Sequence, residues 1–238
     1  MILGLDDKII NYNLFADFNI YKGEPLFIND IRLESALPRN KMVYGIADNF
    51  KEDNFPLVFF KSSSNSSLVM KKNFDLIINS NIEKIWAETE LGFVISKDIN
   101  YKTNEIIDKS YILGYFLAND LTGSIRNQDH HLICSKSCPG FLQIGDFIDT
   151  SFKPRFQKIL LIQDDIKLRE DQIDKRNYDE ISILKYLSKF FNLKKGDSIL
   201  TGAPKRCRDR MYLNKRHNLK LEIEGLEKKD ISINIIKN

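Results

Sequence analysis

The sequence predicts an α+β fold that is predominantly β, and three observations support this. Short runs of β-branched and aromatic residues recur along the chain, separated by turn residues. Only two longer segments repeat apolar residues at helical spacing. No repeat of about 20 to 50 residues and no Gly/Ser- or Pro-rich linker divides the chain. Many short strands with two helices indicate a mostly antiparallel structure built on β-sheets.

Several runs have the composition of strands, because Val, Ile, Leu and Phe dominate them and turn residues flank them. They are "PLVFF" (56–60), "ELGFVI" (90–95), "KILLIQ" (158–163), "DSILTG" (197–202), "LKLEIEG" (219–225) and "ISINII" (231–236). We expect these runs to supply strands of the sheets.

Two helices are expected. In the first, over residues 105–118, Ile106, Leu113 and Phe116 recur at helical spacing. The second, over residues 179–191, sets leucine and isoleucine side chains on one face and ends before a turn at Gly196. These are the only long segments with this period.

The 238 residues include 36 basic and 33 acidic side chains, a net charge of +3. The two signs nearly cancel, so the composition predicts no general field for polyanions and we expect no nucleic-acid partner. The N-terminus carries acids where a signal peptide would need basic residues, and no run of 18 apolar residues occurs. Three cysteines are too few for a disulfide framework. We therefore expect a cytoplasmic protein that does not contact a membrane.

Two glutamates stand one residue apart in "WAETELGFVI". If this run is a strand, Glu88 and Glu90 share one face and Thr89 takes the other. Carboxylates this close repel each other unless a cation lies between them or the face is solvated, and a solvated strand face is the alternative interpretation. Asp120, in "GYFLANDLT", is expected at the C-terminal end of the first helix, which is unfavourable for an acid. Three carboxylates without a nearby His or Cys indicate a site for Mg²⁺, Mn²⁺ or Ca²⁺.

Five motifs in this chain resemble those of the fumarylacetoacetate hydrolase family and occur in the family's order. They are "ETELGFVI", "GYFLANDLT", "KSCPGFLQIGDF", "LKKGDSILTGAP" and "LKLEIEGL". The resemblance implies a rolled mixed β-sheet fold, usually homodimeric, with residues 41–238 as the catalytic domain and residues 1–40 as an N-terminal extension or small subdomain. It also implies that Glu88, Glu90 and Asp120 hold Mg²⁺ or Mn²⁺.

The resemblance further suggests residues that contact the substrate. Lys136 matches a family lysine that places positive charge near the metal-bound substrate or water, and Thr201 in "TGAP" matches a turn that lines the pocket floor. Lys61 also matches a family lysine. For both lysines, exposure to solvent is the alternative. Arg206 stands in a basic run, which we interpret either as a solvated loop or as an anion clamp that binds the substrate.

The sequence departs from the family in the lid segment, where the pattern D-H-A-x-E supplies a catalytic His-Glu dyad. The matching stretch is "YGIADNFKED", so Asn49 takes the histidine position and Glu52 remains as a candidate base. A second departure places Arg169 where the family has glutamine.

The motif "HHLICSKSC" offers two other interpretations. His130 and His131 precede Cys134 and Cys138, but their spacing matches no standard zinc finger. Alternatively, one of these histidines replaces the missing lid histidine.

Family members act on 2-oxo and β-diketo acids by carbon–carbon hydrolysis, decarboxylation, hydration or keto–enol isomerisation. A divalent ion that chelates carboxylate and keto oxygens stabilises the enolate common to these reactions. We therefore expect a metal-dependent hydrolase, lyase or isomerase whose substrate is a small 2-oxo or dicarboxylic acid. The alternatives are a catalytically degenerate member that serves as a metal-binding scaffold and, from the basic run, a nucleic-acid binding module.

Overall fold

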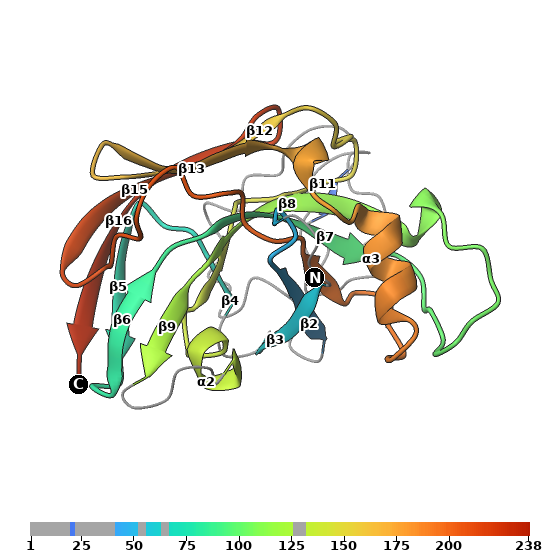
Figure 1. Ribbon diagram of the computed structural model, residues 1–238, viewed down its shortest axis with the longest axis horizontal. Coiled ribbons are helices and arrows are strands. Elements are labelled where there is room, and N and C mark those ends of the chain that lie inside the picture. The colour runs from blue at the N-terminus through green and yellow to red at the C-terminus, as the bar shows by residue number, and fades with distance from the viewer. Residues whose placement is uncertain (1–19, 22–40, 52–55, 63–66, 126–131) are drawn as a thin grey trace.

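The computed structural model describes residues 20–21, 41–51, 56–62, 67–125 and 132–238. These residues form three β-sheets that curl around a shared core, with two short α-helices at the periphery (Figure 1). The predominantly β, α+β fold predicted from the sequence is confirmed.

The largest sheet has nine strands in the described residues. They are β1 (Ile20–Tyr21), β2 (Met42–Ala47), β3 (Leu57–Ser62), β4 (Ser67–Val69), β7 (Thr89–Ile95), β8 (Ile112–Asp120), β10 (Leu142–Ile144), β11 (Ile148–Asp149) and β14 (Ser198–Leu200). Their order is β1-β11-β8-β7-β14-β2-β3, and β10 pairs with both β8 and β4. Every residue of β7 is buried, because other elements cover both faces of this central strand.

A second sheet has five strands in the order β13-β12-β15-β16-β5. Their bounds are β5 (Asn73–Ile78), β12 (Lys158–Gln163), β13 (Ile166–Gln172), β15 (Arg216–Ile223) and β16 (Glu227–Lys237). Burial alternates along β15 and β16, so one face of this sheet packs on the core and the other meets solvent. A short ribbon pairs β6 (Ile82–Trp86) with β9 (Thr122–Ile125).

The helices are α2 (Leu132–Lys136) and α3 (Glu180–Leu187), with 3-10 turns at Lys109–Tyr111 and Ile173–Lys175. The second predicted helix is confirmed as α3. Its N-cap, Asp179, accepts a hydrogen bond from the backbone N–H of Ser182 at 2.8 Å. None of the helices in the described part of the chain is long and apolar enough to span a membrane.

The first predicted helix, over residues 105–118, is wrong. Residues 112–120 form strand β8, and Ile106 is 85% exposed instead of packing on a helix face. The run "YILGYFLA" is apolar on both faces because β8 lies inside the large sheet, and in so short a run periodicity cannot separate a buried strand from a helix. Asp120 therefore ends a strand, so no helix dipole acts on its carboxylate.

All six predicted strand runs overlap observed strands, namely β3, β7, β12, β14, β15 and β16. Strands with more polar or very short sequences, such as β5 and β10, are not among the predictions. The division at residue 40 stays a prediction, because most of residues 1–40 lie outside the described ranges.

A buried carboxyl joins β16 to the turn between β10 and β11. Glu227 accepts a hydrogen bond from the backbone N–H of Asp146 at 2.8 Å, and Lys229 pairs with Asp146. The Glu227 side chain is only 6% exposed, and one of its oxygens has no hydrogen-bond partner among the described residues. Burial raises the pKa of Glu227 from 4.5 to about 7.

We predict that Glu227→Gln flattens the pH dependence of stability. Between pH 4.5 and about 7 the folded state keeps a proton that the unfolded state releases, so the free energy of unfolding falls as pH rises through this window. This fall in the free energy of unfolding is complete above about pH 7 and amounts to about 3 kcal/mol. Urea unfolding at pH 5 and pH 8 measures the fall in wild type and in the variant. An equal loss of stability in wild type and variant would contradict the assignment.

Candidate metal centre

The three carboxylates predicted to bind a metal ion lie at one end of the β7–β8 pair. Glu88 immediately precedes β7, Glu90 lies within it and Asp120 is the last residue of β8. The backbone N–H of Asp120 donates to the carbonyl oxygen of Glu88 at 2.8 Å, which fixes the two strands in register. One carboxylate oxygen from each residue lies within 4.8 Å of the others. Among the described residues this is the group of acidic side chains able to hold a metal ion.

These acids are buried, so the interpretation as a solvated strand face is wrong. Glu90 is 2% exposed and Asp120 is 0% exposed. The side chain of Glu88 is 13% exposed and forms the edge of the cluster nearest to solvent. Buried carboxylates require positive charge or hydrogen-bond donors beside them, and the neighbouring segments supply both.

Lys136, the last residue of α2, bridges two of the acids. Its Nζ lies 2.5 Å from Oδ2 of Asp120 and 3.1 Å from Oε2 of Glu88, and it sits over the ring of Phe59. Burial lowers the pKa of Lys136, but the surrounding carboxylates outweigh burial and raise it above its usual range. The lysine is charged and buried, and the alternative of a solvated loop residue is wrong.

Lys61 supports Asp120 from the opposite side. Its Nζ lies 2.6 Å from Oδ1 of Asp120, and both side chains are 0% exposed. The same ammonium donates to the backbone carbonyl oxygens of Leu121, Lys136 and Phe141 at 3.0, 2.6 and 2.9 Å. Exposure to solvent, the alternative for Lys61, is therefore wrong. With its donors directed at fixed acceptors, Lys61 orients Asp120 and ties β3 to α2.

Arg169 of β13 pairs with Glu88, a contact that sequence reasoning missed. Its Nη2 donates to Oε1 of Glu88, and its Nη1 donates to the carbonyl oxygen of Pro204 at 2.5 Å. Burial raises the pKa of Glu88, but Lys136 and Arg169 outweigh burial and lower it to about 2. The one indication of this contact in the sequence is that Arg169 stands at a position where the resemblance expects glutamine.

Glu90 has a different environment, because no basic side chain forms an ion pair with it among the described residues. Its Oε2 accepts the backbone N–H of Gly202 at 2.8 Å. Burial and the charge of Asp120 raise the pKa of Glu90 well above its usual range. Gly202 has a φ of 96°, a conformation that favours glycine and directs its N–H toward Glu90.

Thr201 lies beside this contact and is fully buried. Its hydroxyl donates to the carbonyl oxygen of Leu91 at 3.0 Å, which ties the "TGAP" turn to β7. The hydroxyl thus holds the turn in place.

Asn49, which the resemblance places at the position of the lid histidine, has a structural role. Its Nδ2 donates to the carbonyl oxygens of Tyr178 and Thr201 at 2.9 and 2.8 Å, and its Oδ1 accepts the N–H of Tyr178 at 2.8 Å. The residue is 1% exposed. All its side-chain hydrogen-bonding groups are therefore engaged with backbone.

Several candidate residues fall outside the described ranges, namely Glu52, His130 and His131. The third histidine, His217, lies in β15 and contacts Asp164 through Nδ1 at 2.6 Å. The thiol of Cys138 lies 3.0 Å from the carbonyl oxygen of Cys134. The zinc interpretation therefore stays untested.

Arg206 is exposed and forms an isolated antiparallel bridge with Arg169. Near it, the guanidinium of Arg210 stacks on the ring of Trp86 at 3.9 Å. These side chains line a small hollow next to Glu88. The basic run thus reaches the edge of the carboxylate cluster.

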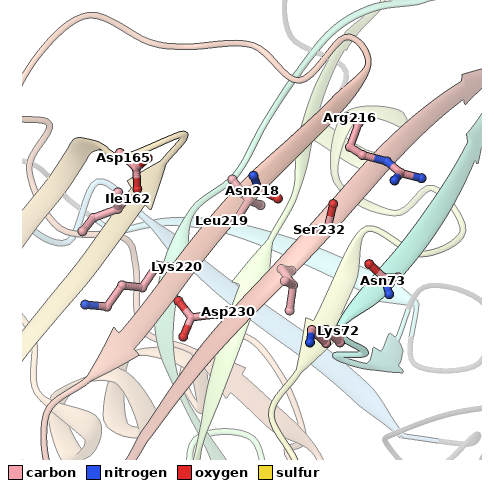
Figure 2. A pocket seen from close by; sticks show the side chains of 11 residues that line it. Lys72, Asn73, Ile162, Asp165, Arg216, Asn218, Leu219, Lys220, Asp230 and Ser232 are labelled. Carbon is pink, nitrogen blue, oxygen red and sulfur yellow. The ribbon is translucent and has the colours of Figure 1, made fainter.

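A larger groove in the described residues lies elsewhere. It has a volume of about 660 Å³ and crosses the exposed face of the five-stranded sheet (Figure 2). Its charged lining is mixed, with Lys72, Arg216 and Lys220 beside Asp165 and Asp230. None of the carboxylates of the cluster lines it. The convergence of buried charge, and not the size of a groove, identifies the candidate site.

Comparison with known proteins agrees with this geometry. A family model described as fumarylacetoacetate (FAA) hydrolase C-terminal matches residues 39–231. The chain belongs to the fumarylacetoacetate hydrolase family.

Two relatives in this family are described as oxaloacetate tautomerases. The protein from Caenorhabditis elegans is 28% identical over 159 residues, which cover 63% of this chain and 71% of the relative. The protein from Escherichia coli is 29% identical over 140 residues, which cover 54% of this chain and 62% of the relative.

Solved structures of fumarylacetoacetate hydrolase family type share the fold. The fumarylpyruvate hydrolase from Pseudomonas aeruginosa, in complex with Mn²⁺ and pyruvate, has a TM-score of 0.71 and 19% identity, and the match covers 92% of this chain and all of that chain. A 5-carboxymethyl-2-hydroxymuconate delta-isomerase from Mycobacterium smegmatis has a TM-score of 0.70 and 19% identity over 83% of this chain and 77% of that chain.

The donor set in this family member suits a hard divalent cation. Glu88, Glu90 and Asp120 offer only carboxylate oxygens, which Mg²⁺ and Mn²⁺ prefer, and no His or Cys is part of the described cluster. Lys61 and Gly202 each hold one ligand residue from outside, as the supports of a metal site do.

We predict that Asn49→Ala lowers the free energy of unfolding by about 2–4 kcal/mol, because three buried hydrogen bonds to backbone are lost. Chemical denaturation measures the change. Asn234→Ala, which removes one exposed side-chain hydrogen bond to Asp75, is the matched control and should cost less than about 1 kcal/mol. Equal costs for the two variants would contradict the structural role of Asn49.

Proposed function

We propose that this protein is a divalent-metal-dependent enzyme that interconverts the keto and enol forms of a small 2-oxo or β-diketo carboxylic acid. The observation that carries the proposal is the buried carboxylate cluster, with oxygens within 4.8 Å and Lys136 bridging two of its members. Oxaloacetate is the first candidate substrate, because two relatives are described as oxaloacetate tautomerases.

In this proposal Glu88, Glu90 and Asp120 hold one Mg²⁺ or Mn²⁺ ion. When bound, such an ion supplies Lewis-acid stabilisation of negative charge on the substrate's keto oxygen. Lys136 keeps a fixed positive charge beside the same carboxylates, where it favours a developing enolate. Lys61 and Gly202 keep Asp120 and Glu90 in place, so little reorganisation is needed during the reaction.

Tautomerisation is preferred to carbon–carbon hydrolysis on the evidence of Asn49. Hydrolysis needs a group that takes a proton from water, and an amide cannot do so near neutral pH. The hydrogen bonds of Asn49 to the backbone of Tyr178 and Thr201 also keep the Asn49 side chain away from a substrate. Tautomerisation needs no activated water, because one base can take a proton from carbon and deliver a proton to oxygen, and Glu52 remains the candidate base for it. Decarboxylation of a 2-oxo acid such as oxaloacetate, which loses the carboxylate β to its keto group, also leaves an enolate and is the second candidate reaction.

A metal-binding scaffold without catalytic activity is the alternative function. It is favoured by Asn49, which the resemblance places at the position of the lid histidine and whose amide is fully engaged with backbone groups. The two proposals differ in turnover and agree in metal binding.

We predict that oxaloacetate tautomerisation requires Mn²⁺ or Mg²⁺ and that Glu90→Gln lowers kcat/KM by about 100-fold or more, because one charged ligand is lost. The enol absorbance in the ultraviolet follows the reaction. Asp165→Asn, an exposed change of the same type in a turn, should keep wild-type activity.

Turnover in chelator-treated protein, or full turnover in Glu90→Gln, would contradict the metal-dependent mechanism. Mn²⁺ binding without turnover of oxaloacetate or any acylpyruvate would favour the scaffold.

A further inference from the structure

Arg169 is buried beside the candidate metal centre and fixed at both terminal nitrogens of its guanidinium. The residue is 9% exposed, with one nitrogen on the Glu88 carboxylate and the other 2.5 Å from the carbonyl oxygen of Pro204. Glu88 accepts Lys136 on its second oxygen at 3.1 Å. An ion that binds Glu88 must therefore share this carboxylate with a lysine and an arginine.

Further positive charge surrounds the same edge of the site. Arg210 interacts electrostatically with Glu88, Arg206 and Arg169. Its guanidinium is held against Trp86, and its Nε is buried without a hydrogen-bond partner among the described residues. A buried donor without a partner is costly, and a hydrogen-bond acceptor that reaches it would satisfy it.

Charge balance sets the kind of ligand that fits. The three carboxylates meet three paired basic side chains, Lys61, Lys136 and Arg169. Arg210 adds a further positive charge beside Glu88, so a divalent ion bound to the ionised carboxylates leaves the site with excess positive charge. A neutral side chain in place of Arg169 would lower this excess by one charge. A buried site favours the ligand that cancels its charge.

We infer that Arg169 makes the metal-loaded site selective for dianionic ligands and, in exchange, weakens the binding of the metal ion itself. This inference rests on the proposed function and gives Arg169 the role of selecting, among the candidate 2-oxo acids, those that carry a second negative charge. The guanidinium competes with a divalent ion for Glu88. Once that ion holds Glu88, the same guanidinium is free to pair with the second charge of the ligand.

The two effects are linked. A divalent ion that draws Glu88 from Arg169 prepares the guanidinium for an anion, and an anion on the guanidinium releases Glu88 to the ion. By reciprocity, the ion and a dianion therefore raise each other's affinity. A monoanion that uses its charge on the metal gains little from Arg169.

The test compares oxalate with oxamate, which both chelate Mn²⁺ and have nearly the same size but carry two and one negative charges. Free Mn²⁺ is followed by electron paramagnetic resonance, and ligand affinity for the Mn²⁺-loaded protein by calorimetry. We expect Arg169→Gln to bind Mn²⁺ roughly tenfold more tightly than wild type. We expect its preference for oxalate over oxamate to fall by roughly tenfold, the loss of about one charge-assisted hydrogen bond.

Arg169→Lys keeps the charge and should keep most of the preference for oxalate, which a purely structural role would not predict. Arg155→Gln, an exposed and distant change of the same net charge, should match wild type in both measurements. Unchanged Mn²⁺ affinity and an unchanged ligand preference in Arg169→Gln would overturn the inference. If neither wild type nor Arg169→Gln binds Mn²⁺, the proposed metal centre fails as well, which separates the two outcomes.

Discussion

Burial of three carboxylates side by side is the constraint on which the rest of this structure depends. Each ionised carboxylate loses several kcal/mol of hydration, and like charges within 4.8 Å repel one another. The chain compensates with Lys61 from β3, Lys136 from α2 and Arg169 from β13, three segments distant in sequence. Hydrophobic side chains of the same volume would stabilise the fold at lower cost. We therefore interpret the cluster as a feature kept for chemistry.

The strands set the positions of the three carboxylates, and the surrounding turns supply their hydrogen bonds. The pairing of β7 with β8 places Asp120 opposite Glu88, so the acids meet without any helix. The "TGAP" turn directs an N–H to Glu90. Asn49 then fastens this turn to the segment before α3, which leaves its amide no part in proton transfer. The site is consequently a rigid cluster of paired charges, and Asn49, which we predict to stand at the position of a lid histidine, has a structural role.

The sequence was informative wherever a local pattern determined the outcome. Runs of β-branched residues located β12, β15 and β16, and the capped amphipathic segment located α3. The spacing of Glu88 and Glu90 gave their shared face. The sequence predicts a helix over the residues of β8, because a strand apolar on both faces has no period of two to detect. The contact between Arg169 and Glu88 spans 81 residues, and such a contact depends on sheet packing that no local pattern encodes. Burial of Lys61 was equally hidden, since lysine is usually exposed.

The most direct test of the metal centre is an anomalous difference map from crystals of the protein grown with Mn²⁺, recorded at the manganese absorption edge. The account predicts one strong peak, with carboxylate oxygens of Glu88, Glu90 and Asp120 all within about 2.3 Å of it. Arg169 should then be displaced from Glu88. A map without a peak at these carboxylates, with Lys136 and Arg169 still paired to them, would contradict the account.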